Sequence, residues 1–316
     1  MNSKDENFID QNKFKIKPNK KSMKELCLPK KFKLQISQKF LSEFFKQSKI
    51  NGILVYHKIG SGKTCTAISI AEKLKNKMNI MIILPAALIG NFRDELRSEC
   101  PGDDYISSKS RKLIQKLKPS DCNFQSIIER SNKKIDKVYT IYSYHKFNDL
   151  VKQNKIKLKN TLLIIDEVQN MISEDGSFYK NLKSSIDSSD KDTRVVLLSA
   201  TPIFDKPVEI ALTLNLLKPE KPIPIGATFN KKFLSLRKSR GEYSYNAKNL
   251  DKFKNLISGM VSYYRGAPPN SFPEQRFNTV KCKMSEFQYK SYLSALSTED
   301  KFIKGSFKNV DILQLP

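Results

Sequence analysis

The chain has 316 residues, with 57 lysines and arginines against 32 acidic residues, and a formal net charge of +25 at pH 7. This excess favours a polyanionic partner such as DNA or RNA, although a solvated basic surface with no specific partner is the simpler alternative. No apolar run approaches a membrane span and the N-terminus lacks a signal-peptide core, so we expect a cytoplasmic protein with no membrane partner.

The cysteines give no pattern of a metal site or a disulfide framework. The chain has five of them and only two histidines, and no two cysteines form a CxxC pair. We therefore expect free, reduced thiols. The positions are Cys27, Cys65, Cys100, Cys122 and Cys282.

The first elements in chain order are an arm and a helix. Residues 1–22 are polar and rich in lysine, which is typical of a flexible basic arm. Residues 34–48 carry apolar positions at helical spacing, which predicts a helix with one face toward the core. The inward positions are Leu34, Phe40, Leu41, Phe44 and Phe45.

Residues 53–64 form the most informative segment. An apolar run leads into a glycine-bearing loop that is followed directly by a helical pattern, which is the context of a P-loop. Glycines allow a backbone to fold round phosphate oxygens, and an ordinary glycine turn is the alternative. The expected nucleotide-binding residues are Gly60, Ser61, Gly62, Lys63 and Thr64.

Two residues of this loop have expected roles, and one is unusual. Lys63 is expected to reach the β- and γ-phosphates of ATP, and the Thr64 hydroxyl to hold Mg²⁺. His57 occupies the place of the usual first glycine.

Four further apolar runs alternate with helical patterns and predict a parallel sheet covered by helices on both faces, an α/β fold. Ligands of such sheets bind beyond the carboxyl ends of the strands. Residues 101–136 are polar and lack periodicity, so we expect a surface insertion there. The expected strands are 79–84, 138–144, 161–167 and 194–201.

A pair of acids and a hydroxyl-rich turn follow two of these strands. Asp166 is expected to complete the Mg²⁺ shell, and Glu167 to orient and deprotonate the attacking water. The hydroxyls of Ser199 and Thr201 could hydrogen-bond Gln169 and so couple the nucleotide to the rest of the domain. A serine/threonine turn before a proline is the plain alternative.

In this order, the P-loop, the acid pair and the Ser-Ala-Thr turn resemble superfamily 2 helicases, and most closely their Swi/Snf-like branch. The resemblance implies a RecA-like first helicase lobe and explains His57, since the first glycine is commonly absent in that branch. Segments 85–96 and 142–147 are similar to the family's nucleic-acid-contacting motifs, and Gln38 to its adenine-reading glutamine.

Three later segments narrow the resemblance. Residues 199–219, 256–277 and 283–292 look like nucleoside triphosphate phosphohydrolase I and related early-transcription ATPases of poxviruses and other large cytoplasmic DNA viruses. The resemblance implies a role in viral transcription, in the host cytoplasm or virion, with RNA polymerase or transcription factors as possible partners.

The sequence departs from the family at two points. Gln169 stands where many relatives have histidine, and no arginine-rich motif of a second lobe precedes Pro316. We therefore expect an ATP-binding lobe at 23–218, a helical extension at 219–316 that begins the connection to a second lobe, and weak hydrolysis without that lobe. The chain is then a fragment or a short gene product.

The leading hypothesis is an ATP-hydrolysing, Mg²⁺-dependent motor that tracks on nucleic acid, with DNA favoured over RNA. A scaffold that binds ATP without turnover is one alternative, and a small-molecule P-loop kinase is another. The basic excess speaks against the kinase.

Overall fold

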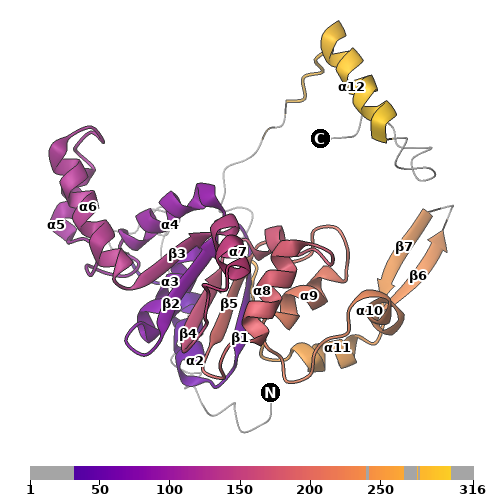
Figure 1. The fold of residues 1–316 in the computed structure, drawn as a ribbon, viewed down its shortest axis with the longest axis horizontal. Helices are drawn as coiled ribbons and strands as arrows, with labels where there is room; N and C mark the ends of the chain where they lie inside the picture. Colours follow the sequence, from indigo (N-terminus) through magenta and orange to yellow (C-terminus); the bar gives the residue numbers. More distant parts are fainter. Residues whose placement is uncertain (1–31, 240–241, 267–275, 277, 300–316) are drawn as a thin grey trace. The chain divides into compact units, whose positions relative to one another are not determined.

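The computed structural model describes residues 32–239, 242–266, 276 and 278–299. The chain divides into one unit of residues 1–268 and a second of residues 269–316. Each unit is described by itself, with helices and strands labelled as in Figure 1.

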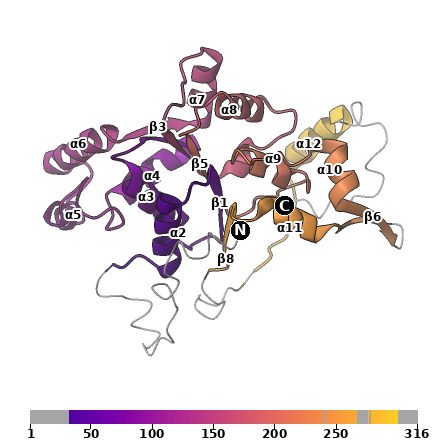
Figure 2. The ribbon, with the colours of Figure 1, turned by 90° about the horizontal axis from the view of Figure 1, so that it is seen from below.

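The first unit contains a six-stranded parallel sheet in the order β3-β2-β4-β5-β1-β8 (Figure 1; β8 is labelled in Figure 2). Its pairings are all parallel, and the register places Val55 of β1 opposite Leu198 of β5 and Ile83 of β2 opposite Ile165 of β4. The strands are β1 (Gly52–His57), β2 (Asn79–Leu84), β3 (Tyr139–Ser143), β4 (Thr161–Ile165), β5 (Arg194–Ser199) and β8 (Val261–Tyr264). The predicted α/β fold class is confirmed.

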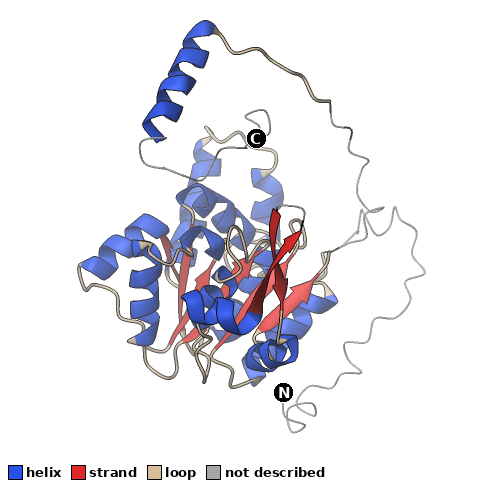
Figure 3. Cartoon of the chain, turned by 90° about the vertical axis from the view of Figure 1, so that its right-hand side faces the viewer, coloured by secondary structure: helices blue, strands red, loops and turns tan. Residues whose placement is uncertain are grey.

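Helices cover both faces of this sheet (Figure 3). One face carries α2 (Ile36–Gln47), α3 (Lys63–Leu74), α4 (Ile89–Leu96) and α6 (Cys122–Asp136). The other face carries α7 (Tyr144–Lys152), α8 (Ser177–Asp187), α9 (Glu209–Asn215), α10 (Gly226–Phe233) and α11 (Leu250–Ile257).

The central strands are apolar on both sides because each side meets its own core. In β1, Ile53 and Val55 join the core under α2 and α3, whereas Leu54 joins the core under α8 and α9. In β4, Ile164 and Ile165 divide in the same way. Side chains alternate along a strand, so a strand buried on both faces reads as a continuous apolar run.

Helix α2 differs in one respect from the prediction. Leu41 and Phe45 are buried, and Leu34 and Phe44 pack partly against the same core, but Phe40 is 38% exposed. A buried position one turn before Leu41 is taken by Gln38, whose Nε2 donates to the Gly62 carbonyl of the P-loop. The inward face of α2 thus includes the polar Gln38, whereas Phe40 lies on the exposed face.

Residues 101–136, which we expected to lack periodicity, form helices α5 (Ser108–Ile114) and α6. The Ser107 hydroxyl caps α5 by accepting a hydrogen bond from the Ser110 backbone. In α6 the partly buried Phe124, Ile127 and Ile128 precede the buried Ser131 and Ile135 at helical spacing, so the helix has an apolar face that the sequence analysis missed.

Beyond β5 the chain forms α9, α10 and an antiparallel hairpin of β6 (Leu234–Ser239) and β7 (Glu242–Ala247). It then enters α11 and returns to the sheet as β8, beside β1. The segment after residue 218, which was expected to form a helical extension, thus also provides one edge strand.

The described part of the second unit contains one helix, α12 (Glu286–Glu299). None of the helices within the described residues is both long and apolar enough to cross a membrane.

Candidate functional site

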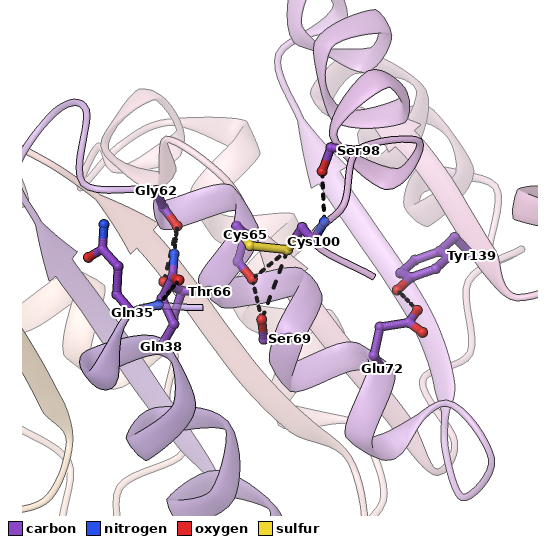
Figure 4. Close-up of a disulfide and its surroundings, with 10 residues drawn as sticks. All are labelled: Gln35, Gln38, Gly62, Cys65, Thr66, Ser69, Glu72, Ser98, Cys100 and Tyr139. Atoms are coloured by element: carbon purple, nitrogen blue, oxygen red, sulfur yellow. Dashed lines mark hydrogen bonds between the residues drawn. A yellow bond between two sulfur atoms is a disulfide. The ribbon is translucent and has the colours of Figure 1, made fainter. Parts of the chain in front are cut away.

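The loop between β1 and α3 is shaped by two glycines with left-handed backbones. Gly60 has φ +75° and Gly62 has φ +76°, a region that favours glycine. The Gly62 carbonyl accepts hydrogen bonds from Gln38 Nε2 and Thr66 Oγ1, both at 3.1 Å (Figure 4). A Cβ at Gly62 would come within 2.7 Å of Gln38 Nε2, so a glycine fits here for two reasons.

The remaining predicted P-loop residues lie in the same turn. Ser61 is buried, and its hydroxyl donates to the Lys58 carbonyl at 2.5 Å, which closes the loop on itself. Lys63 and Thr64 are half-buried in the first turn of α3. The first turn of a helix carries free N–H groups and the positive end of its dipole, so this geometry suits a phosphate.

The acid pair follows β4 at the same edge of the sheet. Asp166 is buried, and its backbone N–H continues the sheet by donating to the Ile83 carbonyl at 2.9 Å. Glu167 has a left-handed backbone with φ +50°, and its N–H donates to Asp166 Oδ1 at 3.0 Å. This bend separates the directions of the two adjacent carboxylates.

The electrostatics of Asp166 connect the acid pair to the P-loop. Burial and then the charge of Glu167 raise the pKa of Asp166 to about 6, while the Glu167 N–H and the Lys63 ammonium lower that pKa. A buried carboxylate beside a second carboxylate is suited to bind a cation, because the cation offsets both the burial and the repulsion.

The oxygen donors here fit magnesium. Mg²⁺ prefers carboxylate and hydroxyl oxygens and is usually held by one or two protein groups plus substrate phosphates. Asp166 and Thr64 are the described residues that could hold it. The donor set contains no thiolate or imidazole.

A series of hydrogen bonds connects Glu167 to the end of β5. Gln169, in the short helix Val168–Met171 (η3), donates from Nε2 to Glu167 Oε2 at 2.7 Å. Its Oε1 accepts from the buried Ser199 hydroxyl, also at 2.7 Å, which is the bond expected from the sequence. Thr201 joins through its backbone N–H, which donates to Ser199 Oγ at 3.0 Å.

Tyr144 also belongs to this site. It lies in segment 142–147, which resembles a nucleic-acid-contacting motif, but its contact with the acid pair was not predicted. Its buried hydroxyl lies within hydrogen-bonding distance of the Asp166 carbonyl and 2.9 Å from the Glu167 carbonyl. Burial raises the pKa of Tyr144 further above its already high usual value, so the group stays a neutral donor. The start of α7 is thereby fixed against the acid pair.

His57 ends β1 at the entrance to the loop and is 1% exposed. Its Nε2 lies 3.0 Å from the Ser262 hydroxyl of β8, whereas its buried Nδ1 has no hydrogen-bond partner in the described structure. Burial, and then the charge of Lys63, lower the pKa of His57 to about 4. His57 is therefore neutral at pH 7.

The prediction of free thiols is wrong for two cysteines. Cys65, the residue after Thr64, forms a disulfide with Cys100, with a Cα–Cα distance of 5.9 Å (Figure 4). The partners are 35 residues apart, and the chain segment that follows α4 brings Cys100 back to α3, so no local spacing could reveal them. The exposed Cys122 and Cys282 are free, and Cys27 lies outside the described residues.

With this geometry in hand, comparison with known proteins identifies the family. The SNF2-related domain matches residues 33–314. A protein of Acanthamoeba polyphaga mimivirus that is named as an ATP-dependent RNA helicase is 51% identical over 300 residues, which are 94% of this chain and 52% of that protein. An African swine fever virus protein named as a termination factor NPH-I homolog is 26% identical over 258 residues, 79% of this chain and 33% of that protein.

Among solved structures, the Sulfolobus solfataricus SWI2/SNF2 ATPase core in complex with dsDNA is similar over 85% of this chain and 52% of that one. The TM-score is 0.46 and the identity 18%. The chain spans about half the length of the mimivirus relative and a third of the swine fever virus relative. The family match and these viral relatives confirm the predicted resemblance to Swi/Snf-like superfamily 2 ATPases and NPH-I. The chain belongs to the SNF2-related domain family.

Proposed function

We propose that this chain is the ATP-binding lobe of a nucleic-acid-dependent ATPase that moves along its polymer, with DNA as the favoured substrate. The observation that carries the proposal is the meeting of the P-loop and the acid pair at one sheet edge, where Lys63 acts electrostatically on the buried Asp166. A phosphate-binding loop beside a buried carboxylate is the arrangement that phosphoryl transfer needs.

Each residue of the site has a distinct role in this proposal. Lys63 and the backbone N–H groups at the start of α3 bind the β- and γ-phosphates. Thr64 and Asp166 hold Mg²⁺, which when bound neutralises charge that develops on the phosphates. Glu167 orients a water and accepts its proton as that water attacks the γ-phosphate.

Gln169 is a positioning residue in this mechanism. It holds one oxygen of Glu167 while its own carbonyl is held by Ser199, so a movement at the end of β5 reaches the general base through two hydrogen bonds. We propose that Gln169, Ser199 and Thr201 couple nucleic-acid contact to hydrolysis. Glutamine transmits the coupling through neutral hydrogen bonds, one donated and one accepted.

Gln38 is proposed to contact the adenine of ATP. Its amide is buried against the Gly62 carbonyl, and its Oε1 accepts from the Gln35 backbone N–H at 2.8 Å. The amide still has a second N–H on Nε2 and a second lone pair on Oε1, which adenine could bind.

The nucleic-acid substrate and the setting are supported by charge and by relatives. The net charge of +25 favours sequence-tolerant contact with phosphates, which weakens strongly with salt. The relatives include viral proteins named as an RNA helicase and as a termination factor homolog. We therefore propose a role in viral transcription, with RNA polymerase or a transcription factor as partner.

The test measures ATP binding and ATP turnover with no nucleic acid, with duplex DNA and with RNA, beside a Lys63→Ala variant. We expect that Lys63→Ala abolishes turnover and weakens ATP binding, and that DNA stimulates the wild-type protein most. Lys180→Ala, an exposed lysine on α8, is the matched control. Equal turnover in wild type and Lys63→Ala would reject the site. ATP binding without turnover under every condition would favour the scaffold alternative.

A further inference from the structure

A large cavity lies at the opposite edge of the sheet from the P-loop. Its volume is about 1060 Å³, and it is lined by the end of α2, the start of β1, the segment that follows α9, and α11 with the turn into β8. Figure 2 shows α2 and α11 on either side of the short strand β8. None of the lining residues belongs to the nucleotide site.

The inner surface of the cavity is mostly apolar. Leu217 is buried there, and partly buried apolar side chains surround it. The others are Phe44, Ile50, Leu256 and Met260. We call these five side chains the floor. Contact with an apolar group would remove their remaining surface from water, which is favourable.

The entrance of the cavity is strongly basic. Four lysines that line it are exposed, and none of them forms an ion pair with a described residue. They are Lys49, Lys221, Lys232 and Lys252, and we call them the rim. Glu220 is the single acid among the lining residues, so the cavity carries a clear positive excess.

The fifth lining lysine is already engaged. Lys218 donates to the Ser189 hydroxyl at 3.1 Å and to the Asp190 carbonyl at 2.7 Å. The contrast shows that a lysine at this edge can find partners within the chain. Among the described residues, the rim lysines form no ion pair and no side-chain hydrogen bond, although the Lys232 ammonium lies 5.4 Å from the centre of the Phe233 ring. Their charges are available to a ligand.

We propose that this cavity binds an acidic peptide segment of a protein partner. A large apolar side chain of that segment fills the floor, and flanking carboxylates face the rim. An apolar anchor in a pocket with charges around it is the usual arrangement of a peptide site.

Two other occupants fit the chemistry less well. Single-stranded nucleic acid binds on aromatic platforms and arginines, whereas one aromatic ring, Phe44, and no arginine line this cavity. The terminal segments of the chain itself have the wrong charge. Residues 1–31 carry nine lysines and four acidic residues, and residues 300–316 three and two.

The position of the cavity leaves the nucleotide site open. Gly52 lines the cavity and His57 enters the P-loop at the other end of the same strand. Six residues of β-strand place these ends roughly 17 Å apart. A bound peptide would therefore tether the motor lobe without obstructing ATP.

The test uses fluorescence anisotropy with the 316-residue chain and two synthetic 12-residue peptides. One carries eight acidic residues with two phenylalanines and two leucines, and the second has serine in place of these four. A 20-nucleotide single-stranded DNA is the third probe. We expect that the first peptide binds at least tenfold more tightly than the serine peptide, because only it can fill the floor.

The variant that tests the rim is Lys49→Glu/Lys252→Glu, and the matched control is Lys109→Glu/Lys180→Glu, which reverses two exposed lysines elsewhere. We expect at least tenfold weaker peptide binding in the rim variant and no change in the control, with ATP binding retained in both. Equal binding of the two peptides, or a rim variant that binds the first peptide normally, would overturn the proposal. So would a rim variant that loses only DNA binding, since the ligand would then be nucleic acid.

Discussion

Polar groups are arranged differently at the two ends of the parallel strands, which we call the carboxyl edge and the amino edge of the sheet. At the carboxyl edge, hydrogen bonds hold each polar side chain of the site in a defined position. They connect Asp166, Glu167, Gln169 and Ser199. At the amino ends of the strands, the rim lysines line a cavity with an apolar floor, and none of them forms an ion pair with a described residue. The first edge is organised for chemistry before a ligand arrives, whereas the second depends on a ligand to complete it.

Replacement of Asp166 by asparagine has the largest expected effect, and this effect should be confined to the nucleotide site at the carboxyl edge. The amide keeps the shape of the carboxylate but cannot supply its charge to Mg²⁺, so we expect ATP turnover to fall by about 100-fold to 1000-fold. Folding should be unharmed, since the buried charge is removed. Turnover and thermal unfolding are measured together, and the rim variant should show full turnover. Asparagine at wild-type activity would exclude Asp166 as a metal ligand.

Removal of the disulfide between Cys65 and Cys100 tests how much this bond stabilises the fold next to the P-loop. Cys100→Ser opens a loop of 35 residues, which should lower the free energy of unfolding by about 4 kcal/mol. Urea denaturation checks this, and wild-type protein in reductant should match the variant. The exposed Cys122→Ser is the control and should unfold as the wild type does. A reductant that leaves the wild-type midpoint unchanged would contradict the bridge.

A smaller effect is expected at the hydroxyl that joins Gln169 to β5. Ser199→Ala leaves one Gln169 oxygen and the Thr201 N–H without their partner, at a cost of about 1–2 kcal/mol in unfolding free energy. ATP should still bind, but nucleic acid should no longer stimulate turnover. Ser188→Ala on the exposed end of α8 is the control for stability. Stimulation that survives in Ser199→Ala would remove the coupling role.

The mildest prediction concerns pH. Because the folded pKa of His57 is about 4 and its unfolded value is 6.5, the unfolded chain binds more protons between these values. This contribution to stability is complete above pH 6.5 and is lost as the pH falls toward 4. Asp166, with its folded pKa raised to about 6, has the opposite slope between pH 3.8 and 6. Urea denaturation of the wild type and of His57→Asn at several pH values isolates the contribution of the histidine. The variant should lose less free energy of unfolding between pH 6.5 and 4. Parallel losses in the two proteins would contradict the lowered pKa of His57.

Local features were predictable, and features that depend on packing were not. The β1–loop–α3 unit is encoded by adjacent residues, so its pattern can be recognised without a structure. Tyr144 and Cys100 act through contacts with distant segments, which neither composition nor spacing reveals. The cavity floor is likewise assembled from four segments of the chain. Helix α6, in contrast, could have been predicted, since Phe124, Ile128 and Ile135 lie at helical spacing within an otherwise polar segment.

The pairing of β1 with β8 has a consequence for the order of folding during synthesis. Leu54 pairs with Val261, so the strand that carries the P-loop keeps one side unpaired after β5 has joined it. The ribosome must add roughly 65 residues between the ends of β5 and β8, which takes about 3 to 13 seconds at usual rates. Until then β1 is an open edge able to pair with another chain. The nascent chain is therefore most prone to mispairing, and most dependent on a chaperone, in the interval before β8 pairs with β1.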